Sequence, residues 1–336
     1  MVIKDRIEAF RNLGISLQRL TESELNTLAE KVILENNWFT FESISLAING
    51  IVHLLDPTKI NIWLENYLPF PNKNKTVGVI MAGNIPMVGF HDAMCVLLCG
   101  YSLIAKPSHQ DSILMKFVLD KIAEIEPRFA PFISIQNRLE GINGLIATGS
   151  DNTARYFEYY FRTIPRIIRK NRTSIAIING RETDEDIVSL GFDVFSYFGL
   201  GCRNISMIYI PKEYDLKYLI KRWQKFSYVL GHSKYQNNYK YQKAVSQISN
   251  RPFIDGVFFL FSKNDKLGSP LSVIYFMEYE NIKALQSEIE KNREKIQIIV
   301  SNKGWFENSL EFGKSQQPNI DDYADKVDTL KFLIQL

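Results

Sequence analysis

The chain has 336 residues, of which 46% are hydrophobic and 23% are charged, close to the average of globular proteins. This composition excludes a mainly disordered chain, and at about 150 residues per domain the length suggests two domains. The 40 basic and 37 acidic side chains leave a net charge of +3. That balance argues against nucleic acid or an anionic membrane as the main partner.

Cysteine usage and the N-terminus point to a reducing compartment. Three cysteines are too few, and odd in number, for a disulfide framework. No Cys-x-x-Cys motif or Cys/His pair has zinc-ligand spacing, so we expect no metal site. The N-terminus MVIKDRIEAF does not look like a secretory signal, and the uncharged stretch 76–91 is too short and too rich in Gly, Asn and Pro for a membrane span. We therefore expect a cytoplasmic protein without a membrane span.

Residues 1–65 are predicted to be mostly helical. Apolar residues recur at helical spacing in 20–40 and again in 41–56, and Pro57 ends the second pattern. The polar, proline-containing stretch 67–75 marks the first boundary.

From residue 76 onward, short β-branched or apolar runs alternate with amphipathic stretches. Such alternation is typical of βαβ units and predicts parallel sheets with right-handed crossovers. The expected strands are 76–81, 102–108, 143–150, 174–180, 206–211, 256–261, 272–276 and 296–301. The expected helices are 90–101, 112–125, 152–161, 184–199, 213–226 and 280–295.

We therefore predict an α/β fold of two Rossmann-like lobes with parallel-rich sheets that meet near residue 180. A helical N-terminal segment takes residues 1–70, the first lobe 71–180 and the second lobe 181–310. The remaining 311–336 form a tail, in which 321–336 is expected to be an edge strand. An unpaired edge invites pairing with another chain, so we expect a homodimer or a higher oligomer.

Two loops of the first lobe have ligand-binding composition. GNIPMVG (83–89) follows a strand, but Phe90-His91 stand where a P-loop needs Lys-Ser/Thr, and no Gly-x-Gly-x-x-Gly motif occurs. Its structural alternative is a turn in which Asn84 caps the next helix. In AKPSHQDS (105–112), Lys106 ends a strand, where α/β sheets bind ligands, or it is simply solvated.

Two further loops contain candidate binding and catalytic residues. In TGSDNTARYF (148–157), Gly149 and Ser150 precede a helix, whose free N–H groups suit a pyrophosphate unless Ser150 is an ordinary cap. In GLGCRN, Cys202 stands in a Gly-rich loop with Gly199 and Gly201, so we expect it to be accessible, whereas Cys95 and Cys99 fall inside an apolar helix and read as core. A thiolate is a suitable nucleophile for a thioester or aldehyde carbonyl.

A basic stretch, 161–172, carries no acidic residue. It contains Arg162, Arg166, Arg169, Lys170 and Arg172. These side chains could bind the phosphates of CoA or of a cofactor, or form a solvated face.

The order of these motifs resembles the aldehyde dehydrogenase superfamily. GNIP, KPS, TGS and a Gly-flanked Cys before a strand occur in its sequence order. NRTSIAIING, KYQNNYKYQKA and DYADKVDTLKFL resemble the fatty acyl-CoA reductase family of the LuxC type, from about residue 70 to the C-terminus. The resemblance implies an aldehyde-dehydrogenase-like fold, in which the first lobe binds NAD(P), the second is catalytic, and the tail strand pairs subunits.

The resemblance also implies the roles of individual residues. Cys202 matches the nucleophile, and its backbone N–H together with the Asn84 amide would donate to the oxyanion. Lys106 matches the lysine that binds the adenosine ribose, with Ser108 in the same KPS motif at the cofactor. The pyrophosphate contact is matched by Gly149 and Ser150.

Departures from the superfamily pattern refine these implications. His109 replaces a glutamate that binds the ribose hydroxyls, which favours NADPH, with NADH as the alternative. Ile168 stands near the position of the base that activates water, so an acyl-enzyme should not hydrolyse readily. The motif that holds the nicotinamide ribose is reduced to KLGSP, with Gly268 and Pro270, and Lys326 stands where relatives prefer Gly.

The resulting expectation is NADPH-dependent reduction of an acyl-CoA, in particular a fatty acyl-CoA, to the aldehyde through an S-acyl-cysteine. One alternative is a semialdehyde-forming reductase of an acyl phosphate. Another is an acyl-binding or scaffold protein that has lost hydride chemistry. An enzyme that activates or transfers the acyl group is a candidate partner.

Overall fold

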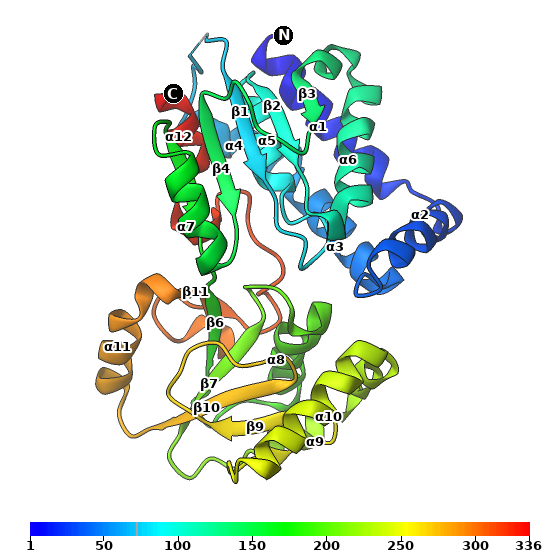
Figure 1. Cartoon of the computed structure of the whole chain (residues 1–336). Coiled ribbons are helices and arrows are strands. Elements are labelled where there is room, and N and C mark those ends of the chain that lie inside the picture. The colour runs from blue at the N-terminus through cyan, green and yellow to red at the C-terminus, as the bar shows by residue number, and fades with distance from the viewer. Residues whose placement is uncertain (72) are drawn as a thin grey trace. The chain divides into compact units, whose positions relative to one another are not determined.

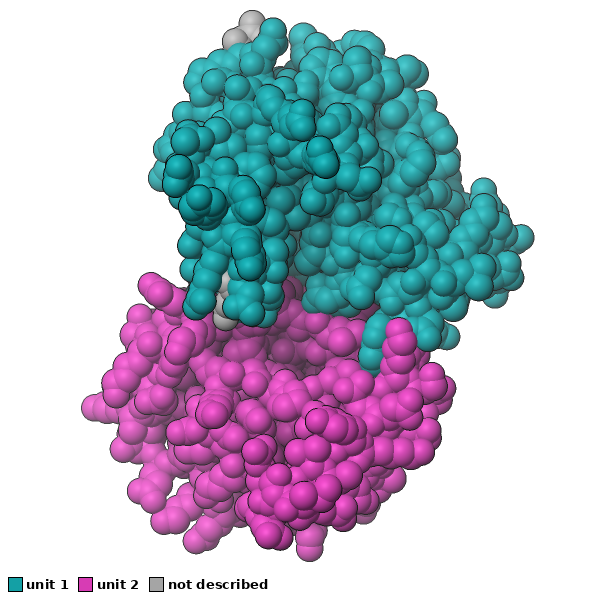
Figure 2. Space-filling model, viewed as in Figure 1, with its two compact units in different colours: residues 1–171, 318–336 teal, residues 172–317 magenta. Residues whose placement is uncertain are grey.

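The computed structural model of the chain describes residues 1–71 and 73–336 and divides into two compact units. Unit 1 comprises residues 1–171 and 318–336, and unit 2 comprises residues 172–317 (Figure 2). The predicted boundary near residue 180 falls later than the observed one, because the strand that begins at Thr173 pairs within the second sheet.

Unit 1 begins with the predicted helical segment. Its four helices are α1 (Ile3–Gln18), α2 (Glu22–Glu35), α3 (Phe41–Leu54) and α4 (Pro57–Glu65). Thr21 and Glu24 form a reciprocal capping box at the start of α2, and Asp56 caps α4 by accepting from the Thr58 and Lys59 N–H groups. Pro57 therefore starts a helix as well as following one, as its fixed φ allows.

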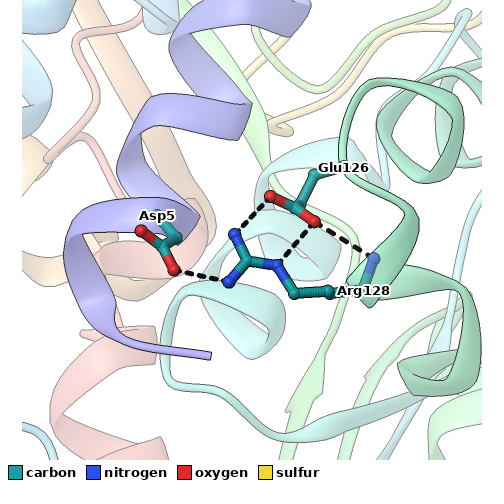
Figure 3. Close-up of polar contacts among 3 residues, drawn as sticks. All are labelled: Asp5, Glu126 and Arg128. Carbon is teal, nitrogen blue, oxygen red and sulfur yellow. Dashed lines mark hydrogen bonds and ion pairs between the residues drawn. The ribbon is translucent and has the colours of Figure 1, made fainter.

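The N-terminal helices pack on the first sheet domain. Helices α1 and α2 lie beside α6 (Ser112–Ile125), and α3 packs against α1 and α2 (Figure 1). Figure 3 shows one polar connection: Arg128 donates to Glu126 at 2.7 and 2.8 Å and to Asp5 of α1 at 2.8 Å. This exposed cluster holds the pKa of Glu126 down to about 2, because Arg128 stabilises its carboxylate.

The sheet of unit 1 is fully parallel, with strand order β3-β2-β1-β4-β5. Its strands are β1 (Thr76–Ile80), β2 (Ser102–Lys106), β3 (Ile133–Ile135), β4 (Gly144–Thr148) and β5 (Arg166–Arg169). Between them lie helices α5 (Phe90–Leu98), α6 and α7 (Asp151–Tyr160). The predicted strands and helices of this lobe are confirmed, and β3 and β5 are additional strands.

The C-terminal segment is a helix, not the predicted edge strand. Residues Thr329–Gln335 form α12, which packs against α5 and buries Leu330 and Leu333 completely. Two turn residues that precede it, Asp325 and Lys326, are left-handed with φ of 58°, a conformation natural for glycine. Because the tail packs on its own unit, an edge strand no longer supports the expected oligomer.

Unit 2 is built on a seven-stranded sheet of order β12-β11-β6-β7-β10-β9-β8, in which only the β8–β9 pair is antiparallel. The strands are β6 (Thr173–Ile177), β7 (Ile205–Pro211), β8 (Ile254–Asp255), β9 (Leu260–Lys263), β10 (Val273–Tyr279), β11 (Ile296–Ser301) and β12 (Leu310–Glu311). The helices are α8 (Asp184–Phe195), α9 (Lys217–Trp223), α10 (Ser233–Ile248) and α11 (Ile282–Lys291).

The predicted α/β architecture with parallel-rich sheets is therefore confirmed in both units. The expected strand 256–261 begins later, at Leu260, since residues 256–259 form a turn closed by the Gly256 N–H on the Phe259 carbonyl at 2.9 Å. Within the described residues, every helix falls short of the length and apolarity that a membrane crossing requires.

Candidate functional site

The carboxyl edge of the unit 1 sheet gathers the loops that the sequence singled out. Ile80 at the end of β1 pairs with Lys106 of β2 on one side and with Ala147 of β4 on the other. The strand order reverses between β1 and β4, and open parallel sheets bind ligands at the carboxyl ends of strands beside such a reversal. This edge carries the predicted residues of unit 1: Asn84, Lys106, Ser108, Gly149 and Ser150.

The loop after β1, residues 81–89, presents Asn84 to solvent. Asn84 lies in a bend and is exposed, while α5 is capped by Gly89 without any side-chain hydrogen bond. The structural alternative, Asn84 as a helix cap, is therefore wrong. An exposed amide on this loop is compatible with the donor role that the resemblance implies.

A buried carboxyl group, that of Asp111, forms a hydrogen bond with the same loop. Asp111 is 1% exposed, and its Oδ2 accepts a hydrogen bond from the N–H of left-handed Met87 at 2.8 Å. Burial raises the pKa of Asp111 to about 8, with Glu35 adding to the rise. Its Oδ1 is buried and has no hydrogen-bond partner among the described residues. The carboxyl is thus largely protonated at neutral pH, and sequence inspection gave no reason to single it out.

The turn after β2 contains Lys106 and Ser108. Lys106 is half-buried, and its ammonium makes no hydrogen bond or ion pair to residues 1–71 or 73–336. Ser108 caps the short helix His109–Asp111 by accepting from the Gln110 N–H at 3.3 Å. A Cβ at Gly83 would lie 2.6 Å from the Cβ of Ser108, so the loop after β1 rests directly on this turn. A glycine is required there for the two loops to meet.

A third loop, after β4, leads into α7. Ser150 caps this helix, accepting from the Thr153 N–H at 3.3 Å, and so confirms the ordinary capping alternative. Gly149 donates its N–H to the Arg169 carbonyl at 3.2 Å. The helix N-terminus at the sheet edge keeps the geometry that suits a phosphate, and the pyrophosphate contact stays a prediction.

The basic stretch is mostly used inside unit 1. Arg169 is 4% exposed, forms an ion pair with Asp92 of α5 and donates to Thr329 of α12 at 3.0 Å. Arg166 donates to three backbone carbonyls, and Lys170 pairs with Glu158 at 3.2 Å. This stretch therefore stabilises the fold, and a phosphate role for Arg166 and Arg169 is not supported.

Unit 2 presents the predicted nucleophile. All three cysteines lie within the described residues, and Cys202 alone among them is exposed. Cys95 and Cys99 are buried in α5, as predicted, and burial raises the pKa of both thiols, that of Cys99 to about 12. The thiolate that a covalent mechanism needs can therefore form most readily at Cys202.

Cys202 is held in a tight turn immediately before β7. The Asn204 N–H donates to the Gly201 carbonyl at 3.0 Å, which places Cys202 at the first central position of a four-residue turn. The Ser174 hydroxyl of β6 donates to the Cys202 carbonyl at 2.8 Å.

Buried Asn204 fixes this turn to the end of α8. Its amide donates to the carbonyls of Asp193 at 3.1 Å and Ser196 at 2.8 Å, and its Oδ1 accepts from the Gly201 N–H at 2.8 Å. Asp193, 1% exposed, accepts from the N–H groups of Gly313 and Ser315, and burial raises its pKa to about 6. Sequence reasoning missed both residues, although Asn204 lies in the quoted GLGCRN motif.

A small cavity of about 40 Å³ lies beside the cysteine loop. Aromatic and aliphatic side chains dominate its lining, among them Phe195, Phe198, Tyr235, Phe259 and Leu271. The KLGSP turn borders it through Pro270, and Gly268 in that turn has a φ of +82°. The volume suits a few small atoms and is far below the 300–1,000 Å³ typical of ligand pockets.

Comparison with known proteins identifies the fold. The chain resembles a benzaldehyde dehydrogenase from Corynebacterium glutamicum, described as NAD-dependent, with a TM-score of 0.65 and 10% identity over 90% of this chain and 76% of that one. It also resembles an aldehyde dehydrogenase from Bacillus cereus in complex with NAD+, with a TM-score of 0.63 and 12% identity over 90% and 72%. A third likeness is to aldehyde dehydrogenase 21 from Physcomitrella patens in complex with succinate, with a TM-score of 0.63 and 12% identity over 99% and 88%.

The chain thus has an aldehyde-dehydrogenase-like α/β fold, and these structural neighbours belong to the aldehyde dehydrogenase superfamily. Neither a scan against protein-family models nor a search of curated proteins finds a match. At these identities the likeness defines the fold alone, and the narrower resemblance to LuxC-type acyl-CoA reductases stays a prediction.

Proposed function

We propose that the chain reduces an acyl-CoA, in particular a fatty acyl-CoA, to the aldehyde through an S-acyl intermediate on Cys202. The observation that carries the proposal is the contrast among the thiols. Cys202 is exposed on a braced turn, whereas burial keeps Cys95 and Cys99 protonated. In an aldehyde-dehydrogenase-like fold, such a thiol is suited to covalent chemistry at a carbonyl carbon.

In the acylation step, the Cys202 thiolate forms a bond to the thioester carbonyl carbon. The carbonyl oxygen takes the electron pair, and the proposed donors to this oxyanion are the Asn84 amide and the Cys202 N–H. One such donor is typically worth about 3 kcal/mol. The carbon–sulfur bond to CoA then breaks, and CoA leaves as its thiolate, which takes up a proton.

A nicotinamide dinucleotide is the proposed cofactor, and its chemistry when bound is to supply a hydride to the acyl carbon. The donor set of unit 1 fits such a ligand: Lys106 is a half-buried cation without a partner in the described residues, and the α7 N-terminus lies at the same sheet edge. Collapse of the resulting thiohemiacetal releases the aldehyde and restores the Cys202 thiol. The sequence predicts NADPH from His109, with NADH as the alternative.

Two alternatives remain. One is an acyl-phosphate reductase: the basic stretch could serve either phosphate donor, and because Arg166 and Arg169 bind partners within unit 1 it favours neither. A non-reducing acyl-binding protein differs from the proposal only in hydride chemistry.

A thiol nucleophile also suits a reducing, cytoplasmic setting, where it stays reduced.

The test follows absorbance at 340 nm and intact mass for the full chain mixed with NADPH or NADH and a series of acyl-CoAs. We expect loss of absorbance with aldehyde formation, and a mass gain of one acyl group when the dinucleotide is omitted. Cys202→Ala should lose both signals, whereas Cys99→Ala, which removes a buried thiol, should keep them. Retention of full activity by Cys202→Ala would refute the mechanism, and acylation without dinucleotide oxidation would favour the non-reducing alternative.

A further inference from the structure

A carboxylate from a distant part of the chain lies at the turn after β2. The local sequence KPSH offers none before Asp111, but Glu35, the last residue of α2, reaches this turn. Its Oε1 accepts a hydrogen bond from the Ser112 hydroxyl at 2.8 Å and lies 4.0 Å from the Nδ1 of His109.

The side chain of the next residue, Asn36, also holds the end of α2 against this turn. Asn36, 6% exposed, donates from its Nδ2 to the Gln110 carbonyl at 3.1 Å and accepts from the Trp38 N–H at 3.2 Å. The end of α2 is thus held against residues 109–112 by two neighbouring residues. Glu35 therefore has a defined position at the β2 turn rather than the mobility of a surface glutamate.

Glu35 retains an acceptor for a ligand. Its side chain is 20% exposed, and its Oε2 makes no hydrogen bond to the described residues. His109, by contrast, is 89% exposed, so its ring can move away from the turn. The charged group with a fixed place at this turn is the carboxylate of Glu35.

We propose that Glu35 sets the cofactor preference of the unit 1 site and favours NADH over NADPH. In dinucleotide-binding folds an acidic side chain accepts hydrogen bonds from the adenosine ribose hydroxyls, and the same charge repels a 2′-phosphate. Here α2 places the acidic side chain of Glu35 at this turn, although His109 occupies the corresponding sequence position. The inference rests on the proposed function, because it assumes that a dinucleotide binds at this edge.

The inference reverses the preference expected from His109 alone. NADPH is expected from His109 only if no carboxylate lies near the ribose position. Glu35 places a carboxylate at this turn. Lys106 would attract a 2′-phosphate, whereas the Glu35 carboxylate, 4.0 Å from the His109 ring, would repel it.

The test measures binding rather than turnover. Dissociation constants of NADH and NADPH are obtained for the full chain from the change in nicotinamide fluorescence, and isothermal titration provides a second readout. Glu35→Gln keeps the side-chain shape and the acceptor for Ser112 while it removes the charge. Glu30→Gln, on the exposed face of the same helix, is the matched control.

We expect the unmodified chain and Glu30→Gln to bind NADH at least tenfold more tightly than NADPH. Glu35→Gln should reduce this ratio about tenfold, mainly through tighter binding of NADPH. Tighter binding of NADPH by the unmodified chain, or an unchanged ratio in Glu35→Gln, would overturn the role of Glu35 and leave the proposed function intact. Failure of both dinucleotides to bind the unmodified chain would overturn the proposed function and this inference together.

Discussion

Asn204 offers a direct test of whether the fold holds Cys202 in place. Its side chain makes three hydrogen bonds of 3.1 Å or less with buried or half-buried backbone groups, those of Gly201, Asp193 and Ser196, and a longer one of 3.4 Å to the Val194 carbonyl. Asn204→Ala removes the side chain that pairs with these backbone groups. The groups must then bind water or stay unpaired. At roughly 1 kcal/mol per hydrogen bond, the free energy of unfolding of unit 2 should fall by about 3 kcal/mol.

The same substitution should release the cysteine turn. Without the amide, the Gly201–Asn204 turn loses its bonds to the end of α8, while its own backbone bond at 3.0 Å, the Ser174 contact and the Arg203 bond to the Ser315 carbonyl stay. We therefore expect the rate of Cys202 alkylation by iodoacetamide to change severalfold and the rate of S-acylation to fall. Urea denaturation reports the stability, and intact mass reports both reactions.

Asn238→Ala is the matched control. Asn238 is half-buried on α10, and its side chain donates to the Lys234 carbonyl at 2.9 Å. Its removal should change the free energy of unfolding by less than about 0.5 kcal/mol and leave Cys202 chemistry unchanged. If Asn204→Ala behaved like this control in both measurements, the bracing of the turn by Asn204 would be refuted.

Two further predictions concern buried charge in unit 1. Arg169→Met leaves Asp92 buried without its cation and should lower the free energy of unfolding by about 3–5 kcal/mol in urea denaturation, whereas Arg162→Met at an exposed site should change it little. The pKa of Asp111 is raised to about 8, so its contribution to stability is full below about pH 4 and is lost as the pH rises to about 8. Asp111→Asn should therefore flatten the fall in urea midpoint between pH 5 and pH 9, and an unchanged slope, equal to that of exposed Asp120→Asn, would contradict the assignment.

The sequence predicted the elements that depend on local pattern. Alternation of β-branched runs with amphipathic helices gave the parallel sheets, and the loops at the carboxyl ends of β1, β2 and β4 followed from it. The strand β5 was missed because its arginines suggested a solvated face. Arg169 in fact points inward, where Asp92 on α5 neutralises it, and no local pattern could have shown that pairing.

The site was predictable only in part for a similar reason. Cys202 has a local signal, namely a loop with Gly199 and Gly201 just before a strand, and its exposure agrees with that signal. Glu35 has none, because α2 is separated in sequence from the turn that it reaches. The C-terminal segment is expected to be an edge strand, whereas Leu330 and Leu333 lie one helical turn apart and bury the same face of α12.

The discontinuity of unit 1 has a consequence for synthesis on the ribosome. The chain leaves this unit at Asn171 and returns at Pro318, so α12 is made only after the whole of unit 2. At 5–20 residues per second the interval lasts roughly 10–30 s. During that time α5 lacks its cover of Leu330 and Leu333, and Arg169 lacks Thr329. Nascent unit 1 therefore exposes an apolar surface for chaperones to shield, while unit 2 has every strand that it needs to fold first.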